Sequence, residues 1–182
     1  VVASNATNDI AKTDIKINGV DFTASDFDVS ATTVDGTATD ISGNIAAGGE
    51  QSGAIAVKIN ENTGAHGVTA RAFNKITATA YSSAAVTINS VAITAQTTIN
   101  DFVNAVNDQI ANVSAKINAD GFVEFSNEDG DAIQFASSTS LGITADIYGG
   151  FVELKSADGG PIVIEAGTDD NGYNADTGES AD

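Results

Sequence analysis

Two acidic stretches carry the side chains of this chain that are best suited to chemistry. They read SNEDGD and TDDNGYNADTGESAD, and both place carboxylate and amide oxygens at close spacing. The candidate ligands are Asn127, Asp129 and Asp131 in the first stretch and Asp169, Asn171 and Asp176 in the second. Calcium prefers such hard oxygen ligands, but the second stretch lacks the glycine position and the flanking helices of a helix-loop-helix calcium site. Bound calcium and solvated acidic turns are therefore both open for these residues.

Catalytic chemistry has little support in the sequence. The one histidine, His66, lies in the loop TGAHGV without the partners that a catalytic triad or a histidine metal site needs. The sequence contains no nucleophile elbow and no phosphate loop. A glycosidase would need two carboxylates about 5–10 Å apart in a cleft, yet the acids fall mostly in turns and no aromatic platform accompanies them. We therefore expect an ordinary loop histidine, no catalytic residue and no enzyme activity.

The charge balance limits the partners of the chain. It has 25 acidic against 7 basic residues, a formal net charge of −18, and no dense cluster of lysine and arginine. Nucleic acid and anionic membrane surfaces require such clusters, so neither is an expected partner. The absence of cysteine excludes disulfides and thiolate zinc sites. No apolar run reaches the ~18 residues that span a bilayer, so membrane insertion is not expected.

The strongest structural signal is a hairpin followed by a helix. Apolar residues alternate over 86–93 around a turn at Asn89-Ser90. Thr98 is expected to cap a helix over 99–110, and Asp101, three residues later, completes a capping box. The apolar stripe of this helix is expected to pack on the domain's own sheet. Three further strands are expected at 113–117, 122–126 and 132–135.

A weaker version of the same pattern precedes it. Residues 14–22 alternate around Asn18-Gly19, which is typical of a tight hairpin turn. A short helix is expected over 55–61, followed by two strands within 68–82 that a turn at Asn74-Lys75 joins. The remaining expected elements are a lead-in at 1–12, short strands and loops at 23–53, and a hairpin at 151–164 that turns at Asp158-Gly159-Gly160.

Aligning these segments reveals a duplication. Ile59-Asn60 matches Val106-Asn107, and Val68-Thr69-Ala70 matches Val113-Ser114-Ala115. The expected fold class is therefore α+β and strand-dominated, with two β-β-α-β-β-like repeat units whose short helices pack on antiparallel sheets. The expected units are 1–84 with an insertion at 23–53, then 85–166 with an extra hairpin, and an acidic, mobile tail at 167–182.

The predicted core collects the apolar residues of these elements. Its members are Ile17, Val20, Ile59, Val68, Ile88, Ile93, Phe102, Val106, Val113, Phe122, Phe151, Leu154, Ile162 and Ile164. Phe102, on the helix, is expected to be buried against the sheet.

Each unit also carries a recurring motif in which Ile-Asn-Gly or a close variant is followed by a helix ending in an apolar residue and Asn. The matching pieces are Ile17-Asn18-Gly19, Ile59-Asn60, Thr63-Gly64, Gly67-Val68-Thr69-Ala70, Ile88-Asn89, Val106-Asn107 and the stretch FVELKSADGGPIVIE. This motif resembles the "IN" motif of the variable central region of bacterial flagellins, which also occurs in hook-associated and filament-cap proteins. The resemblance extends from about Asp14 to Glu165, with Ser90 in place of the glycine in the second copy.

The resemblance implies a structural function. It places the chain in the solvent-exposed outer domain of a flagellin-like motility filament, extracellular on the bacterial flagellum or secreted, where it would set surface charge, antigenicity and adhesion. Neighbouring filament subunits would be bound through the terminal heptad helices of a full flagellin, which these 182 residues do not include. Some relatives carry O-linked sugars on such regions, and the matching stretches here are SDFDVSATT and FASSTS. The alternative is a secreted or surface module that binds glycans or host receptors, with calcium ordering its acidic loops.

Overall fold

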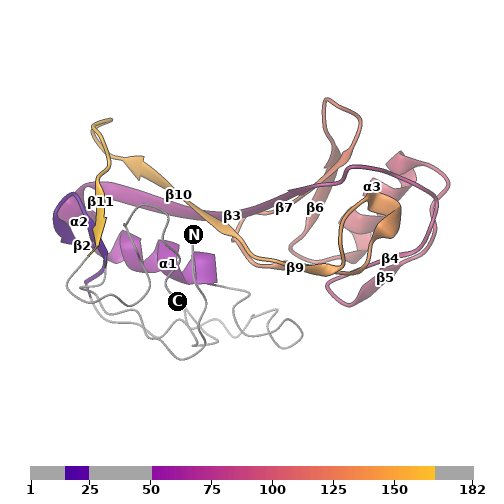
Figure 1. The fold of residues 1–182 in the computed structure, drawn as a ribbon, viewed down its shortest axis with the longest axis horizontal. Coiled ribbons are helices and arrows are strands. Elements are labelled where there is room, and N and C mark those ends of the chain that lie inside the picture. Colours follow the sequence, from indigo (N-terminus) through magenta and orange to yellow (C-terminus); the bar gives the residue numbers. More distant parts are fainter. Residues whose placement is uncertain (1–14, 25–50, 167–182) are drawn as a thin grey trace.

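The computed structural model describes residues 15–24 and 51–166, which form a strand-dominated α+β fold of three antiparallel sheets and short helices (Figure 1). The helices are α1 (Gln51–Glu61), α2 (Thr63–His66) and α3 (Ile99–Gln109), with a 3-10 turn, η2, at Thr139–Leu141. The strands are β1 (Ile15–Ile17), β2 (Val20–Asp21), β3 (Val68–Thr77), β4 (Val86–Ile88), β5 (Val91–Ile93), β6 (Ser114–Ile117), β7 (Val123–Asn127), β8 (Ile133–Ser137), β9 (Asp146–Tyr148), β10 (Phe151–Ser156) and β11 (Ile164–Ala166). The predicted lead-in at 1–12, the acidic tail and nearly all of the 23–53 insertion lie outside the described residues.

The elements form two units of the same design at opposite ends of an elongated molecule (Figure 1). In unit 1 (15–24, 51–73 and 151–166), the β1–β2 hairpin pairs with β11, α1 packs on β3, and β3 pairs with β10. In unit 2 (74–150), the β4–β5 hairpin pairs with β8, α3 packs on β6, and β6 pairs with β7. The predicted duplication is thus visible in the strand pairing.

Unit 2 is inserted within unit 1. Residues 151–166 align without a gap on residues 122–137, FVELKSADGGPIVIEA against FVEFSNEDGDAIQFAS. Gly159 and Gly130 occupy the same turn position, and both have left-handed backbones with φ of 74° and 82°. Strands β10 and β11 are therefore the unit 1 counterparts of β7 and β8. The sequence predicted a boundary between the units at residue 84 and assigned residues 151–166 to the second unit. The strand pairing joins these residues to unit 1 instead, because β10 pairs with β3 and β11 with β1.

Strand β3 runs continuously through both units, so the predicted turn at Asn74-Lys75 is wrong. Residues 68–73 pair with β10, and residues 74–77 pair with β7. The strand changes partner at Asn74, whose buried side-chain amide donates to the carbonyl oxygens of Asp131 (2.9 Å) and Tyr148 (2.7 Å). A polar residue that suggested a turn in the sequence therefore holds the β7–β8 turn and the end of β9 at the point where β3 changes partner.

The predicted hairpin at 151–164 is also wrong, because β10 and β11 belong to different sheets. The chain does turn at Asp158, whose carboxylate accepts hydrogen bonds from the Ser156 hydroxyl (2.6 Å) and the Gly160 backbone N–H (2.9 Å). The hydrogen bond from the Ser156 hydroxyl has the larger effect and that from the Gly160 N–H the smaller, and together they hold the pKa of Asp158 below its usual value. The turn directs the chain away from β10 and across to the edge of β1.

The two other predicted hairpins and the capped helix are confirmed. Asn18 and Gly19 turn β1 into β2 with φ of 53° and 77°, and Asn89 and Ser90 turn β4 into β5 with φ of 46° and 66°. Two successive positive φ values define the tight turn that matches strand twist. At the start of α3, the Thr98 hydroxyl accepts from the Asp101 backbone N–H (3.1 Å), as the capping box predicts.

Each unit has its own buried core. In unit 1 it contains Ile17, Phe22, Ile55, Ile59 and Val68. The unit 2 core is larger and includes Val86, Ile88, Ile93, Phe102, Val106, Val113, Val123, Phe125, Ile133, Phe135 and Leu141. Val20, Leu154 and Ile162 are only partly buried. The prediction is wrong for Phe122, Phe151 and Ile164, which are 37%, 51% and 41% exposed. Phe151 is the first residue of β10 and Phe122 directly precedes β7, and neither is among the residues of the two cores.

Candidate functional site: asparagine clamps and the junction of the units

The asparagine in each hairpin turn binds the backbone of a residue distant in sequence, Val163 just before β11 or Gln134 in β8. Asn18 donates its backbone N–H to the Val163 carbonyl (2.8 Å), and its side-chain oxygen accepts from the Val163 N–H (2.9 Å). Asn89 makes the same pair of bonds to Gln134, at 2.9 and 2.8 Å. The side chain of each asparagine thus extends the ladder between the hairpin and the strand beside it.

The asparagine near the end of each long helix clamps the strand that follows. The Asn60 amide donates to the Ala70 carbonyl and accepts from the Ala70 N–H, both at 2.8 Å. The Asn107 amide does the same with Ala115, at 3.0 and 2.6 Å. An amide side chain offers one donor and one acceptor side by side, as a peptide group does. This matched geometry explains why the motif needs asparagine at both positions.

Removing one helix clamp gives a direct test of this role. Asn107→Ala is expected to lower the free energy of unfolding by about 1–2 kcal/mol, because Ala115 loses both partners on the helix side. Asn104→Ala, one turn earlier on an exposed face of the same helix, should change it by less than about 0.5 kcal/mol. Urea unfolding of the two variants measures the difference, and equal losses would contradict the clamp.

The two hairpin-turn asparagines, Asn18 and Asn89, differ in the hydrogen bonding of one atom, the side-chain nitrogen. The Asn18 side-chain N–H donates to the His66 carbonyl at 2.9 Å. In unit 2 the equivalent nitrogen of Asn89 is buried and has no hydrogen-bond partner among the described residues. The cause is a shorter connection, because Asn60 and Ala70 are ten residues apart whereas Asn107 and Ala115 are eight apart. Helix α2, which supplies the carbonyl in unit 1, has no counterpart in unit 2.

His66 has a structural role at the end of α2. Its ring is buried, with Nε2 3.1 Å from the Ile59 carbonyl and Nδ1 accepting from the Val68 N–H at 3.1 Å. A backbone N–H can donate only to an unprotonated Nδ1, so the ring carries its proton on Nε2 and donates it to Ile59. Both ring nitrogens are therefore engaged by the backbone.

The candidate ligands of SNEDGD form a turn that the protein itself organises. The buried Asn127 amide oxygen accepts from the N–H groups of Asp129 (2.8 Å) and Asp131 (3.0 Å). Its amide nitrogen donates to the Asn112 carbonyl (2.7 Å) and lies 3.3 Å from an Asp131 carboxylate oxygen. The Asn127 oxygen thus faces two donors in this arrangement. Within the described ranges, no group of three or more His, Cys, Asp or Glu residues is placed to hold a metal ion.

The other candidate ligands, Asp169, Asn171 and Asp176, lie outside the described residues.

The junction of the units is packed too closely for side chains at two glycines. A Cβ on Gly150 would lie 2.0 Å from the Gly130 carbonyl oxygen and 2.5 Å from the Ser52 hydroxyl. A Cβ on Gly130 would lie 2.6 Å from that of Ala72. The buried Ser52 hydroxyl donates to the Gly130 carbonyl at 2.6 Å, which joins α1 of unit 1 to the β7–β8 turn of unit 2. The absence of side chains at both glycines is what allows this contact.

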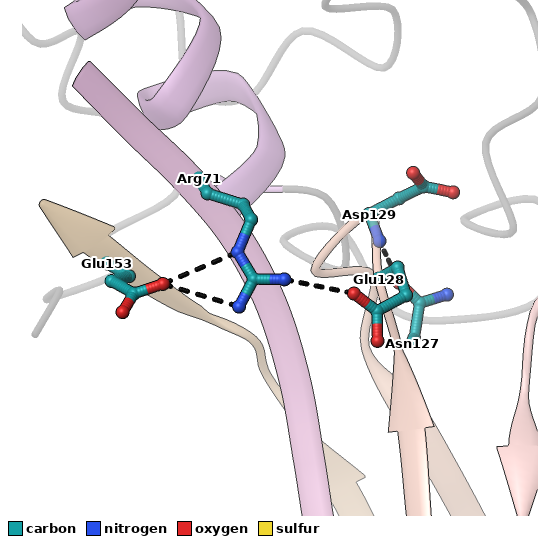
Figure 2. A network of polar contacts seen from close by, with 5 residues as sticks. All are labelled: Arg71, Asn127, Glu128, Asp129 and Glu153. Carbon is teal, nitrogen blue, oxygen red and sulfur yellow. Dashed lines mark hydrogen bonds and ion pairs between the residues drawn. The ribbon is translucent and has the colours of Figure 1, made fainter. Parts of the chain in front are cut away.

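A surface ion-pair network also crosses the junction (Figure 2). Arg71 on β3 binds Glu153 on β10 through Nε (3.4 Å) and Nη2 (3.3 Å), and Glu128 of the β7–β8 turn through Nη1 (3.0 Å). The three side chains are 59–78% exposed, so water and salt screen them and their contribution to stability is small. The network therefore links the turn of unit 2 to unit 1 and adds little stability.

A second carboxylate, Glu124 on β7, is covered by two lysines. Its side chain is 9% exposed and lies 2.6 Å from the Lys75 ammonium and 2.9 Å from that of Lys116. The hydrogen bond from Lys75, then that from Lys116, lowers the pKa of Glu124. Lys116 is directly opposite Glu124 across β6 and β7, as Arg71 is opposite Glu153 in unit 1. The duplication thus preserves a cross-strand base–acid pair.

The pH dependence of stability reports on this pair. The folded-state pKa of Glu124 is lowered, so its contribution is present above the unfolded carboxyl pKa of about 4.3 and is lost as pH falls through the folded value. Glu124→Gln should cost about 1 kcal/mol at pH 7, a value limited by the exposed lysines, and progressively less below pH ~4. Glu153→Gln, the exposed counterpart, should cost less than about 0.5 kcal/mol. Thermal melts of both variants at pH 7 and below pH ~4 measure these losses. Equal losses for Glu124→Gln and Glu153→Gln at pH 7 would contradict the stabilising role of Glu124.

Sequence reasoning missed Ser52, Asn74 and Glu124. Glu124 had a usable signal, because Phe-Val-Glu occurs at both 122–124 and 151–153 and each glutamate faces a base. Ser52 and Asn74 had none, since their partners are backbone carbonyls of residues brought close only by the nested topology. The polar groups described above hold the backbone or one another.

Among the described residues, no helix is long and apolar enough to cross a membrane. Comparison with protein-family models and with curated proteins found no match.

Proposed function

We propose that this chain is a non-catalytic structural module on the solvent-facing surface of a flagellin-like filament, in a flagellin or in a hook-associated or filament-cap relative. The observation that carries the proposal is the paired use of the Ile-Asn motifs. In both units the apolar residue enters the core and the asparagine clamps a neighbouring strand. The motif residues thus have an architectural role, which supports a structural function for the chain.

The charge of the chain supports an exposed location for this module. A formal net charge of −18 keeps copies of a protein apart and in solution. In a filament that displays many copies, such a surface would face the medium. The ion pairs and the closely packed junction link the two units at several points, which suits a projecting module.

Immunoelectron microscopy on the native source tests the proposal. Antibodies raised against the 182-residue protein should label extracellular filaments along their length if the parent protein is a flagellin. Label confined to filament tips or hook junctions supports the relatives instead. Label on the cell body alone, or none on filaments, would overturn the proposal. Mass spectrometry of sheared filaments provides a second readout, because peptides of this chain must occur there within a longer polypeptide.

The same spectra can locate sugars in FASSTS. Ser137 and Thr139 are exposed, whereas Ser138 is buried and donates to the Ile143 carbonyl at 2.9 Å. If the filament carries O-linked sugars in this stretch, we expect them on Ser137 or Thr139. A sugar on Ser138 would contradict the observed packing, because the hydroxyl is inaccessible.

A further inference from the structure

The central sheet, β10-β3-β7-β6, has one face that no helix of residues 15–24 and 51–166 covers. Along β3 the even-numbered residues from Val68 to Ile76 are buried or half-buried beneath the helices, and Thr69, Arg71, Lys75 and Thr77 on the opposite side are exposed. The strand pairing places Phe151 opposite Phe73 and Glu153 opposite Arg71 on this same side. We call it the outer face of the central sheet.

Aromatic residues that are missing from the cores gather on the outer face. The described residues include seven of the eight phenylalanines, and four of these are fully buried. Of the other three, Phe73 and Phe151 lie on the outer face. Phe122 directly precedes β7, and the alternation of that strand directs it to the same side. Phe73 and Phe151 stack with ring centroids 5.7 Å apart, and Phe151 is 51% exposed. Exposed aromatic side chains are typical anchors of protein interfaces.

The bases of the chain gather on the same face. Six of its seven lysine and arginine residues are described, and four of them, Arg71, Lys75, Lys116 and Lys155, lie there. They accompany three carboxylates, those of Glu124, Glu128 and Glu153. The outer face is therefore close to charge-balanced, on a molecule whose formal net charge is −18.

We propose that the outer face binds a second copy of this chain, face to face across a two-fold axis. Two such copies repel each other through most of their surface, because like charges meet. The charge-balanced face is the place where they approach without that cost, and its bases and acids can pair with their counterparts in the partner. A two-fold contact uses the same patch on both copies, so a patch with both signs of charge is self-complementary. Stacked sheets lie about 10 Å apart, which lets the phenylalanines interdigitate.

Sedimentation velocity on the full chain tests the proposal across protein concentration and at about 20 and about 300 mM salt. We expect a monomer–dimer equilibrium that strengthens with salt, because screening removes the long-range repulsion while the apolar contact remains. A monomer at every concentration and at both salt levels would overturn the proposal and leave the face for another partner.

Variants then locate the contact. Phe151→Ser should weaken dimerisation about 10-fold or more, because a two-fold interface loses the ring twice. Lys155→Glu should weaken it without removing apolar surface. Val57→Ser is the matched control, since Val57 is 39% exposed on α1, across the sheet from the outer face, and should leave the dimer unchanged. Circular dichroism confirms that each variant is folded. A dimer that Val57→Ser weakens, or that survives both outer-face variants, would overturn the assignment.

Discussion

Phe102→Ala is expected to lower the free energy of unfolding by ~3–5 kcal/mol, the range for a buried phenylalanine reduced to alanine. Phe102 is 1% exposed, and its ring meets Phe125 edge-on with centroids 6.3 Å apart. Its ring also packs on that of Tyr81, with centroids 5.7 Å apart. The Tyr81 hydroxyl donates to the Gln96 carbonyl, just before α3, at 2.8 Å. Loss of the ring leaves a cavity between α3 and its sheet and removes the support of the segment that leads into the helix.

Urea unfolding followed by circular dichroism measures this loss. Phe122→Ala is the matched control, because Phe122 is 37% exposed at the end of the β6–β7 hairpin. The control should cost less than about 1 kcal/mol, in proportion to the smaller area buried. A Phe102→Ala variant as stable as the parent protein would contradict the placement of α3 on the sheet.

Gly150→Ala is expected to cost about 3 kcal/mol or more, at the upper end of overpacking effects, because backbone has to move. The added Cβ would lie 2.0 Å from the Gly130 carbonyl oxygen and 2.8 Å from its carbon. Both are main-chain atoms, so no side-chain rotation can relieve the clash. The carbonyl also accepts the Ser52 hydrogen bond, which the displaced turn would lose.

The neighbouring glycine provides the control for this substitution. A Cβ on Gly149 would meet nothing within 4 Å, so Gly149→Ala should be nearly neutral. Thermal unfolding of both variants distinguishes a local clash from a general intolerance of substitution in the segment. Similar melting temperatures for the two variants would show that the junction is looser than the structure has it.

The sequence predicted the local elements well, because their signals are local. Asn18-Gly19 and Asn89-Ser90 fix hairpins through backbone preference, and Thr98 fixes a helix start through its side chain. The α+β class followed from these elements, and the matched asparagines identified the duplication. Each of these signals acts within a few residues of the chain.

What could not be predicted depends on contacts that are distant in sequence. The sequence predicts a turn at Asn74, because its partners, Asp131 and Tyr148, are 57 and 74 residues away and leave no local signal. Alternation correctly identified β10 as a strand, but it does not say which face is covered, so Phe151 was assigned to the core. Of the candidate calcium ligands, only the SNEDGD set lies in the described residues. In that set, the amide oxygen of Asn127 was the predicted calcium ligand, but it accepts hydrogen bonds from two backbone N–H groups.

The nested arrangement makes unit 2 an interchangeable part, because it is inserted between two segments of unit 1. Phe73 and Phe151 face each other across β3 and β10, so the chain leaves unit 1 and returns to it at adjacent points. A two-residue Asn-Gly turn between them would close β3 and β10 into an ordinary hairpin. Unit 2, residues 74–150, can then vary in length and sequence or be replaced by an unrelated domain. Unit 1 keeps the pairing of β3 with β10 in each case. A fold built this way can change its inserted unit without altering the unit that holds both ends of the described chain.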